Sequence, residues 1–150
     1  MSIVNQIELA EARTIYVRWG PTILRFCELF LGDKTIAGQI TAECFVRFLR
    51  EVHPAEGSDI AVHLLRAAFE IASHSRLGNC DSSQPLEAAL VQIEALPRAV
   101  FILRSVLCLQ VPLVAAICGV SADEVRQVWF RALVEIRRRL PQDFFKEQGR

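Results

Sequence analysis

The sequence predicts an all-α protein made of two small helical domains joined by a short linker. Apolar residues recur at spacings of three and four along almost the whole chain, and no stretch alternates with the period of two that is typical of a strand. The composition changes at residues 76–85 (RLGNCDSSQP), where Gly, Asn, Asp, Ser and Pro gather as they do in linkers. We therefore expect helical domains over residues 1–76 and 86–150, with a linker over 77–85.

The first two helices are expected to meet at a Gly-Pro step. A helix at about residues 7–19 should end at Gly20, and Pro21 should open the next helix, which runs to about Leu31. Gly32 and the aspartate after it should then break that helix. The pattern predicts a pair of short helices at the start of the chain.

The next two helices are expected at about residues 35–52 and 59–75, with a loop at 53–58 between them. The former has one apolar stripe, which consists of Ile36, Ile40, Cys44, Phe45, Phe48 and Leu49. Its other face is polar and is free for a partner. The polar residues of that face are Gln39, Glu43, Arg47 and Arg50.

The second domain is expected to begin with helices at about 86–96 and 98–108, separated by Pro97. A short apolar helix follows and should stop at Gly119, because glycine enters the left-handed conformation without a Cβ clash. Ser121 and Glu124 then form a capping box, in which each side chain bonds the other residue's amide. This order of elements is typical of a helix-turn-helix.

The helix after Ser121 combines an inner apolar face with an outer basic one. Positions where the two crossing helices should meet are Val114, Ala115, Cys118, Val120, Val125 and Val128. Arginine and glutamine can bond base edges bidentately in the major groove, and residues 126–140 hold five arginines against one acid. The candidate DNA-binding residues are Ser121, Arg126, Gln127, Phe130, Arg131, Arg137 and Arg138. The alternative is an ordinary helical hairpin with a solvated charged face.

Composition and residue spacing argue against several functional classes. The chain is 52% hydrophobic and 23% charged, with no apolar run long enough for a membrane helix and no signal peptide, so we expect a soluble cytoplasmic protein without membrane contact. Five cysteines occur singly, and the three histidines pair with no nucleophile or carboxylate at a telling spacing. We expect no metal, no cofactor, no small-molecule substrate and no enzymatic activity.

The chain resembles a small RNA polymerase sigma factor of the extracytoplasmic-function (ECF) type. Residues 96–140 follow the family's region 4 pattern: a leucine-proline, a VF-L-LR helix, a short apolar helix, a Gly-Ser turn and a basic helix. Residues 15–76 resemble region 2, with AGQITAECFVRFLR similar to the segment that grips the polymerase clamp. The resemblance implies core RNA polymerase and promoter DNA as partners, with an anti-sigma factor as a further one. It also places Arg126, Gln127 and Arg131 at the minus-thirty-five element.

The sequence departs from the family at three places. In the clamp-binding segment, residues 39–43 (QITAE) stand where the family has Asp-Leu-Val-Gln-Glu, so Gln39 and Ala42 differ. In the expected minus-ten helix, the family's Arg-Asn pair falls on residues 69–70 (FE), and Asp123 adds an acid at the start of the recognition helix. Acids that face DNA weaken its binding by repulsion.

The linker also restricts the distance that the two domains can span. About ten extended residues reach roughly 33 Å, whereas promoter elements 20 to 25 base pairs apart lie about 70 to 85 Å from each other along B-DNA. Three hypotheses follow from these observations. The chain is an ECF-type transcription initiation regulator, a sigma-like protein that binds an anti-sigma factor or other regulator without promoter recognition, or a simple helix-turn-helix regulator.

Overall fold

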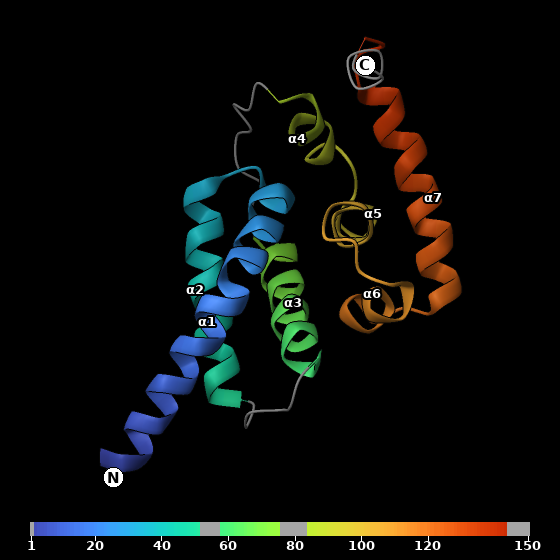
Figure 1. Cartoon of the computed structure of the whole chain (residues 1–150). Coiled ribbons are helices and arrows are strands. Elements are labelled where there is room, and N and C mark those ends of the chain that lie inside the picture. Colours follow the sequence, from blue (N-terminus) through green and yellow to red (C-terminus); the bar gives the residue numbers. More distant parts are fainter. Residues whose placement is uncertain (1, 52–57, 76–83, 144–150) are drawn as a thin grey trace.

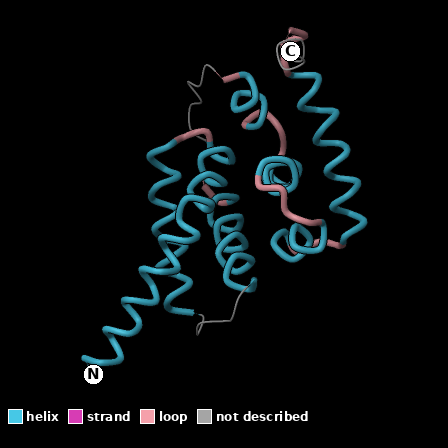
Figure 2. Tube along the Cα trace, viewed as in Figure 1, coloured by secondary structure: helices cyan, strands magenta, loops and turns pink. Residues whose placement is uncertain are grey.

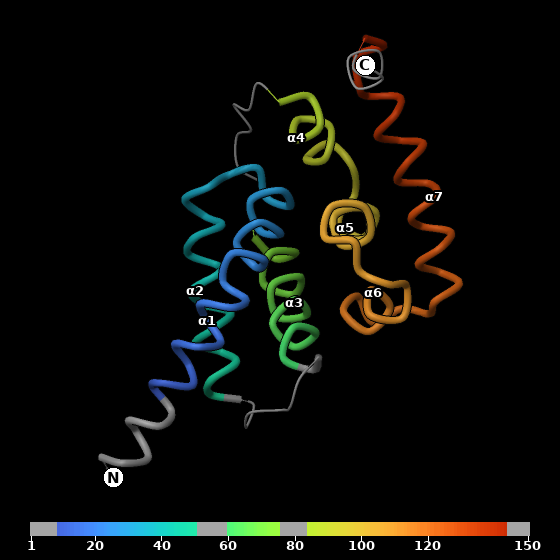
Figure 3. Tube along the Cα trace, viewed as in Figure 1, coloured from blue at the N-terminus to red at the C-terminus, as the bar shows by residue number. Residues whose placement is uncertain are grey.

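The computed structural model contains helices and loops and no strand in the part of the chain that it describes, residues 2–51, 58–75 and 84–143 (Figure 1, Figure 2). This confirms the all-α prediction. The first group of elements is α1 (Ser2–Leu31), α2 (Lys34–Glu51) and α3 (Ser58–Ser73). The second is α4 (Pro85–Leu90), α5 (Ala95–Phe101), the π-helical turn η1 (Ile102–Val106), α6 (Val111–Cys118) and α7 (Ala122–Arg139). Figure 3 traces this order along the chain.

The helix α1 is continuous, so the predicted break at Gly20 and Pro21 is wrong. Proline inside a helix removes one hydrogen bond to the carbonyl four residues earlier, here that of Val17. The Val17 side chain is 67% exposed, so this face of α1 lies next to water, which can hydrate the unpaired carbonyl. Buried residues on both sides of the proline, Ile15 and Ile23, keep the helix packed across it.

The helix α2 begins and ends within a residue of its predicted bounds. Gly32 adopts a left-handed φ of 71° and ends α1, and the Asp33 Oδ1 accepts the amide of Ile36 at 3.0 Å in the first turn of α2. The apolar stripe is buried as expected at four positions, while Ile36 is half-buried. Leu49 is 51% exposed, so its predicted place in the core is wrong.

Pro97 does not separate two helices, contrary to the prediction. It lies in the first turn of α5, where the first amides of a helix lack intrahelical partners and a missing N–H is tolerated. The break falls earlier, between Leu90 and Ala95, and the expected helix at 98–108 is divided into α5 and η1. The Leu107 amide donates to the Ile102 carbonyl at 2.9 Å, five residues back, which is the bond of a π-helix.

Three of the four described cysteines are at least partly buried, as expected for small apolar side chains. Burial raises the pKa of Cys27 to about 11 and the pKa values of Cys44 and Cys118 to about 12, so these groups remain thiols at neutral pH. Cys108 is exposed at a positive φ of 57° between η1 and α6.

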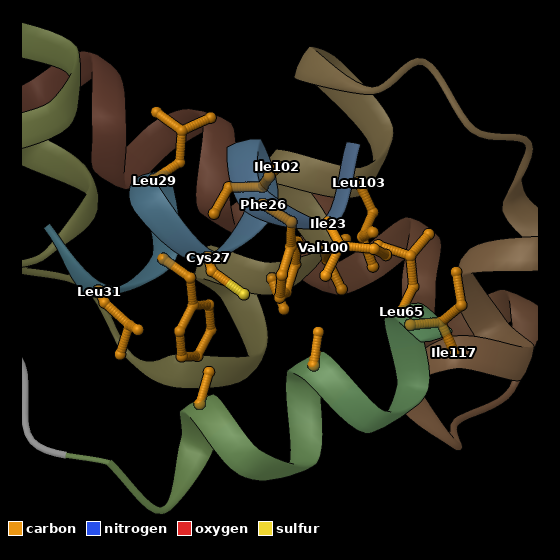
Figure 4. Packing of buried hydrophobic residues seen from close by; sticks show 14 of the residues in the cluster. Ile23, Phe26, Cys27, Leu29, Leu31, Leu65, Val100, Ile102, Leu103 and Ile117 are labelled. Atoms are coloured by element: carbon orange, nitrogen blue, oxygen red, sulfur yellow. The ribbon is translucent and has the colours of Figure 1, made fainter. Parts of the chain in front are cut away.

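Residues from both halves of the chain form one buried apolar cluster (Figure 4). Phe26 of α1, Leu65 of α3 and Leu103 of η1 are each at most 2% exposed within it. The division into two domains remains a prediction from sequence, since the linker falls almost wholly on residues 76–83, which lie outside the described residues. Of the loop predicted at 53–58, residues 53–57 lie outside them too, and Ser58 begins α3. Where they are described, the two groups of helices pack directly against each other.

The side chain of Arg98 joins the two groups at the centre of this packing. It is 4% exposed, and its guanidinium donates to the carbonyls of Phe30, Leu90 and Ile93 at 2.9, 2.9 and 2.6 Å. Its Cζ lies 4.6 Å from the centroid of the Phe30 ring, and burial lowers the pKa of the guanidinium. The carbonyls of Phe30 and Leu90 belong to the last turns of α1 and α4, where helical carbonyls often lack partners, although that of Leu90 also accepts the Ile93 amide at 3.3 Å.

We predict that Arg98→Ala lowers the free energy of unfolding by about 3 to 5 kcal/mol, because it leaves the carbonyls of Phe30 and Ile93 without their donor and opens a cavity. Arg98→Lys should restore only part of this, since an ammonium cannot reproduce the guanidinium's planar fork. Arg25→Ala, on the exposed side of α1, should change stability by less than about 0.5 kcal/mol. Urea unfolding followed by circular dichroism measures all three, and equal stability of Arg98→Ala and Arg25→Ala would contradict the prediction.

Candidate nucleic-acid interface

The turn between α6 and α7 has the predicted geometry. Gly119 adopts φ 70° and ψ 33°, and both its amide and that of Val120 donate to the Ala115 carbonyl, at 2.9 and 3.2 Å. The Ser121 Oγ then accepts the Glu124 amide at 3.1 Å and starts α7. The reciprocal half of the capping box, from the Ser121 amide to the Glu124 carboxylate, is not formed. Half of the predicted box is sufficient to begin the helix at a defined residue.

The inner face of α7 packs on α5 through four small or β-branched residues, namely Val125, Val128, Ala132 and Ile136, each at most 3% exposed. On α6, Val114 is fully buried while Ala115 and Cys118 are half-buried. On α6, Ile117 is also buried although it was not among the predicted positions. The predicted phase of α7 is confirmed. It fixes which residues of α7 face outward.

Trp129 attaches the middle of α7 to η1. The indole Nε1 donates to the Ser105 Oγ at 2.9 Å, and the Cζ of Arg104 lies 4.9 Å from the centroid of the ring. Arg104 is held in turn by its Nη1, which donates to the Leu109 carbonyl at 3.0 Å. The π-helical turn thus presents two consecutive side chains to one aromatic ring. Trp129 itself is half-buried.

The candidate DNA-binding residues lie on the outward side of α7, with Ser121 at its N-cap. All seven are exposed: Ser121, Arg126, Gln127, Phe130, Arg131, Arg137 and Arg138. Arg126 and Arg131 are five residues apart and therefore lie about 140° from each other around the helix, with Phe130 between them. Phe130 is 67% exposed and Leu133 beside it is 38% exposed. This face combines cations with an exposed apolar strip formed by Phe130 and Leu133.

Asp123, the acid at the start of α7, pairs with Arg126. Its Oδ1 lies 2.8 Å from the Nη1 of Arg126, one turn further along α7. The side chains are 88% and 61% exposed, so the pair is weak and water competes for both partners. Arg138 and Arg139 share Glu135 in a similar way, at 3.8 and 3.5 Å. These acids reduce the positive charge that the face presents.

A groove of about 690 Å³ runs beside this face, between α7 and the segment that connects α4 to α5. Arg131 and Phe130 lie on its α7 side, together with the carboxylates of Glu124 and Glu135. The two flanks of α7 therefore differ in charge. Arg131 has acidic neighbours, whereas Arg126 has Asp123 alone as its described ion-pair partner.

The polar face of α2 places Gln39, Glu43 and Arg50 in solvent, as predicted. Arg47 is instead drawn toward α3, where its Nη2 lies 2.9 Å from the Oε2 of Glu70. Glu70 was expected to face DNA; it forms an ion pair with the neighbouring helix. An ion pair thus connects the expected partner face of α2 to α3, the expected minus-ten helix.

Phe69 is directed away from solvent, and so it is not available at a DNA surface as its position in the family pattern suggested. It is half-buried, with its ring centroid 6.1 Å from that of Phe30 in an edge-to-face contact. Its neighbour Ala68 is fully buried. This part of α3 therefore contributes to the core.

The cap on the end of α6 was not predicted. Arg66 of α3 donates from its Nε and Nη2 to the Ala116 carbonyl, at 3.1 and 2.6 Å. This carbonyl lies in the last turn of α6 and has no partner within the helix. The donor and acceptor are 50 residues apart, so no local pattern in the sequence could have indicated the contact.

Within the described residues there is no cluster of three or more His, Cys, Asp or Glu side chains placed to hold a metal ion. The helices of the same residues are all too short or too polar to cross a membrane.

Comparison with known proteins identifies no family. No family model matches the chain, and no curated protein matches it. Among solved structures, a chain of the RsbN–BldN complex is similar over 91% of this chain and 99% of that chain, with 22% sequence identity and a TM-score of 0.39. A likeness at this TM-score carries no argument about function.

The orientation of α7 can be tested by placing the same charge on its two faces. We predict that Val125→Asp abolishes the cooperative unfolding transition, because an unpaired carboxylate would replace a fully buried side chain. Phe130→Asp, on the exposed face, should change the free energy of unfolding by less than about 0.5 kcal/mol. Thermal melts of both variants measure the difference. A native melting temperature in Val125→Asp would show that the helix phase is wrong.

Proposed function

We propose that this chain is a sigma-factor-like transcription regulator of the ECF type, which binds promoter DNA through the outward face of α7. One observation carries the proposal: a capped helix after a glycine turn exposes Arg126, Gln127 and Arg131 on the side opposite a fully buried stripe. In helix-turn-helix proteins the second helix lies in the major groove and its first residues contact base edges. Arginine and glutamine suit guanine and adenine there.

The charge of α7 supports contact with a phosphate backbone. From Arg126 to Leu140 the helix holds five arginines and one acid. The ion pairs of Arg126 and Arg138 are exposed, and exposed pairs are worth at most about 1 kcal/mol. Phosphate oxygens can therefore replace the carboxylates with only a small loss of interaction free energy. Phe130 lies between the flanking arginines, where an aromatic side chain can contact a thymine methyl group.

The exposed face of α2 is the surface that we assign to core RNA polymerase. It offers Gln39, Glu43 and Arg50 to solvent, and the resemblance of residues 37–50 to the family's clamp-binding segment supports the assignment. Arg47 would have to exchange its ion pair with Glu70 to join this contact. A protein that works on DNA and polymerase would act in the cytoplasm, without a cofactor and without a catalytic step of its own.

A second candidate function is favoured by the apolar strip on α7. Phe130 and Leu133 are exposed by 67% and 38%, and Asp123 neutralises the first arginine of the face. Such a surface also suits a protein partner, since aromatic and arginine side chains dominate protein interfaces. In this case the chain would bind an anti-sigma factor or another regulator and would not recognise a promoter. A simple helix-turn-helix regulator, the third hypothesis, would instead dimerise and give a palindromic footprint.

Two measurements on the purified full chain decide among these functions. The first selects duplexes from a random library and footprints the selected sequence; the second asks whether the chain co-purifies with core polymerase subunits. We expect a non-palindromic footprint together with polymerase binding. Polymerase binding without duplex selection would leave the protein-binding role as the correct one, and a palindromic footprint without polymerase would support the simple regulator. Absence of both interactions contradicts the proposed function.

The pair of Asp123 with Arg126 leads to a gain-of-affinity prediction. Asp123→Asn should tighten binding to the selected duplex by about 1 kcal/mol, or roughly fivefold, because it frees Arg126 and removes a charge that repels phosphate. Stability should fall by less than about 1 kcal/mol, since an exposed pair and one helix-dipole interaction are lost. Glu11→Gln, an exposed acid on α1, is the matched control and should leave affinity unchanged. Fluorescence anisotropy measures these affinities, and equal behaviour of the two variants would contradict the assignment.

Arginines along α7 should differ in what they contribute. Arg126→Ala should lose about 1 to 3 kcal/mol of binding and relax the choice of base at one position. Arg137→Ala should weaken binding to every sequence and lower the slope of log affinity against log salt by about one. Repeating the duplex selection and a salt titration with each variant separates the two effects. Identical slopes and identical selected sequences would show that neither residue has its assigned role.

A further inference from the structure

Few side chains of α3 are exposed. From Ile60 to Ser73 every side chain is buried or half-buried except those of Glu70 and Ser73. The helices α1 and α2 pack against it within the first group, and α6 packs against it from the second group (Figure 1). The helix that the sequence pattern places at a promoter's minus-ten element is therefore covered on both sides.

The contact between α3 and α6 combines apolar packing with a charged cap. Leu65 of α3 and Ile117 of α6 are 2% and 1% exposed in the shared cluster (Figure 4). Arg66, the next residue of α3, gives two hydrogen bonds to the Ala116 carbonyl. Bonds from a charged donor are about twice as strong as neutral ones, and this donor also faces the negative end of the α6 dipole. The cap fixes α6 on α3 in one position.

The outward face of α7 is unaffected by this packing and remains exposed. The helix α7 packs on α5 and α6, and α6 packs on α3, so one continuous core holds α7 at a fixed place relative to α3. Two promoter elements about 20 base pairs apart are separated by roughly 70 Å. In the packed arrangement one chain can contact a single DNA segment through α7, and α3 cannot contact a second one.

We propose that α6 is an intramolecular cover of α3, held in place by Arg66, and that this closed arrangement restricts the chain to a single DNA segment until the α3–α6 contact opens. The restriction on DNA rests on the function proposed for α7. The closure itself does not, and it can be measured without DNA.

Closure is tested by amide hydrogen exchange and small-angle scattering on the full chain. A compact chain of this length has a radius of gyration of about 15 Å, and we expect the wild-type value to be close to that. Arg66→Ala should speed exchange in α3 and α6 by on the order of tenfold, as loss of a charge-assisted hydrogen bond does, with the amides of α1 changed less. Arg25→Ala removes the same charge from the exposed side of α1 and should exchange like wild type.

The closed arrangement is overturned if Arg66→Ala exchanges like Arg25→Ala, or if the wild-type radius of gyration is above about 20 Å, well beyond the compact value. Should Arg66→Ala fail to fold, Arg66→Lys takes its place, because it keeps the charge and gives up the two-pronged bond. A smaller acceleration confined to α3 and α6 is then expected. If Arg66→Lys changes exchange in α3 and α6 no more than in α1, the proposal is likewise contradicted.

A footprint on the selected duplex tests the consequence for DNA. Wild type should protect one continuous segment, and Arg66→Ala should keep its affinity for that duplex because the outward face of α7 is unchanged. Two protected segments about two helical turns apart with the wild-type chain would refute the restriction. If no duplex is selected, the function proposed for α7 fails, while the exchange measurement still decides whether α6 covers α3.

Discussion

The burial of Arg98 is the interaction on which the rest of the structure depends. Where a helix ends inside a core, its last carbonyls have no partners within the helix. Burying them without another hydrogen-bond donor would destabilise the fold. The guanidinium supplies donors to Phe30, Leu90 and Ile93 at once, and the negative ends of two helices together with an aromatic ring compensate its charge. All its described partners are neutral groups. An arginine can therefore join two groups of helices at one buried point.

Arg66 repeats this device in the opposite direction. Arg98 lies in the second group of helices and binds a carbonyl of α1, whereas Arg66 lies in the first group and binds the Ala116 carbonyl of α6. Each of the two cations thus donates hydrogen bonds to the last turn of a helix in the opposite group. The Gly119 turn then joins α7 to α6, and the hydrogen bond of Trp129 to Ser105 attaches α7 to η1, so α7 has little freedom of orientation. Packing at the centre thus sets which face of α7 is exposed.

The features that could be predicted from the sequence are those that neighbouring residues determine. Gly119 and Ser121 specify the turn through their own backbone and side chain, so the helix-turn-helix and the phase of α7 could be predicted. The predictions at Pro21 and Pro97 were wrong for different reasons. Tertiary packing keeps α1 helical on both sides of Pro21. Pro97 lies in the first turn of α5, where no backbone N–H is needed. The ion pair of Asp123 with Arg126 follows a spacing of three residues and could have been predicted. The contacts of Arg66 and Arg98 across 50 and 68 residues could not.

The central claim is that α7, and not α3, is the surface that meets DNA. Titration of the ¹⁵N-labelled chain with its selected duplex, followed by amide chemical shifts, tests this claim directly. We expect the largest shifts at Arg126, Gln127, Phe130 and Arg131, with the amides of α3 unchanged. Chemical-shift changes concentrated in α2 or α3, with no change in α7, would contradict the assignment of α7 to DNA. A spectrum that does not change with any duplex would contradict it as well.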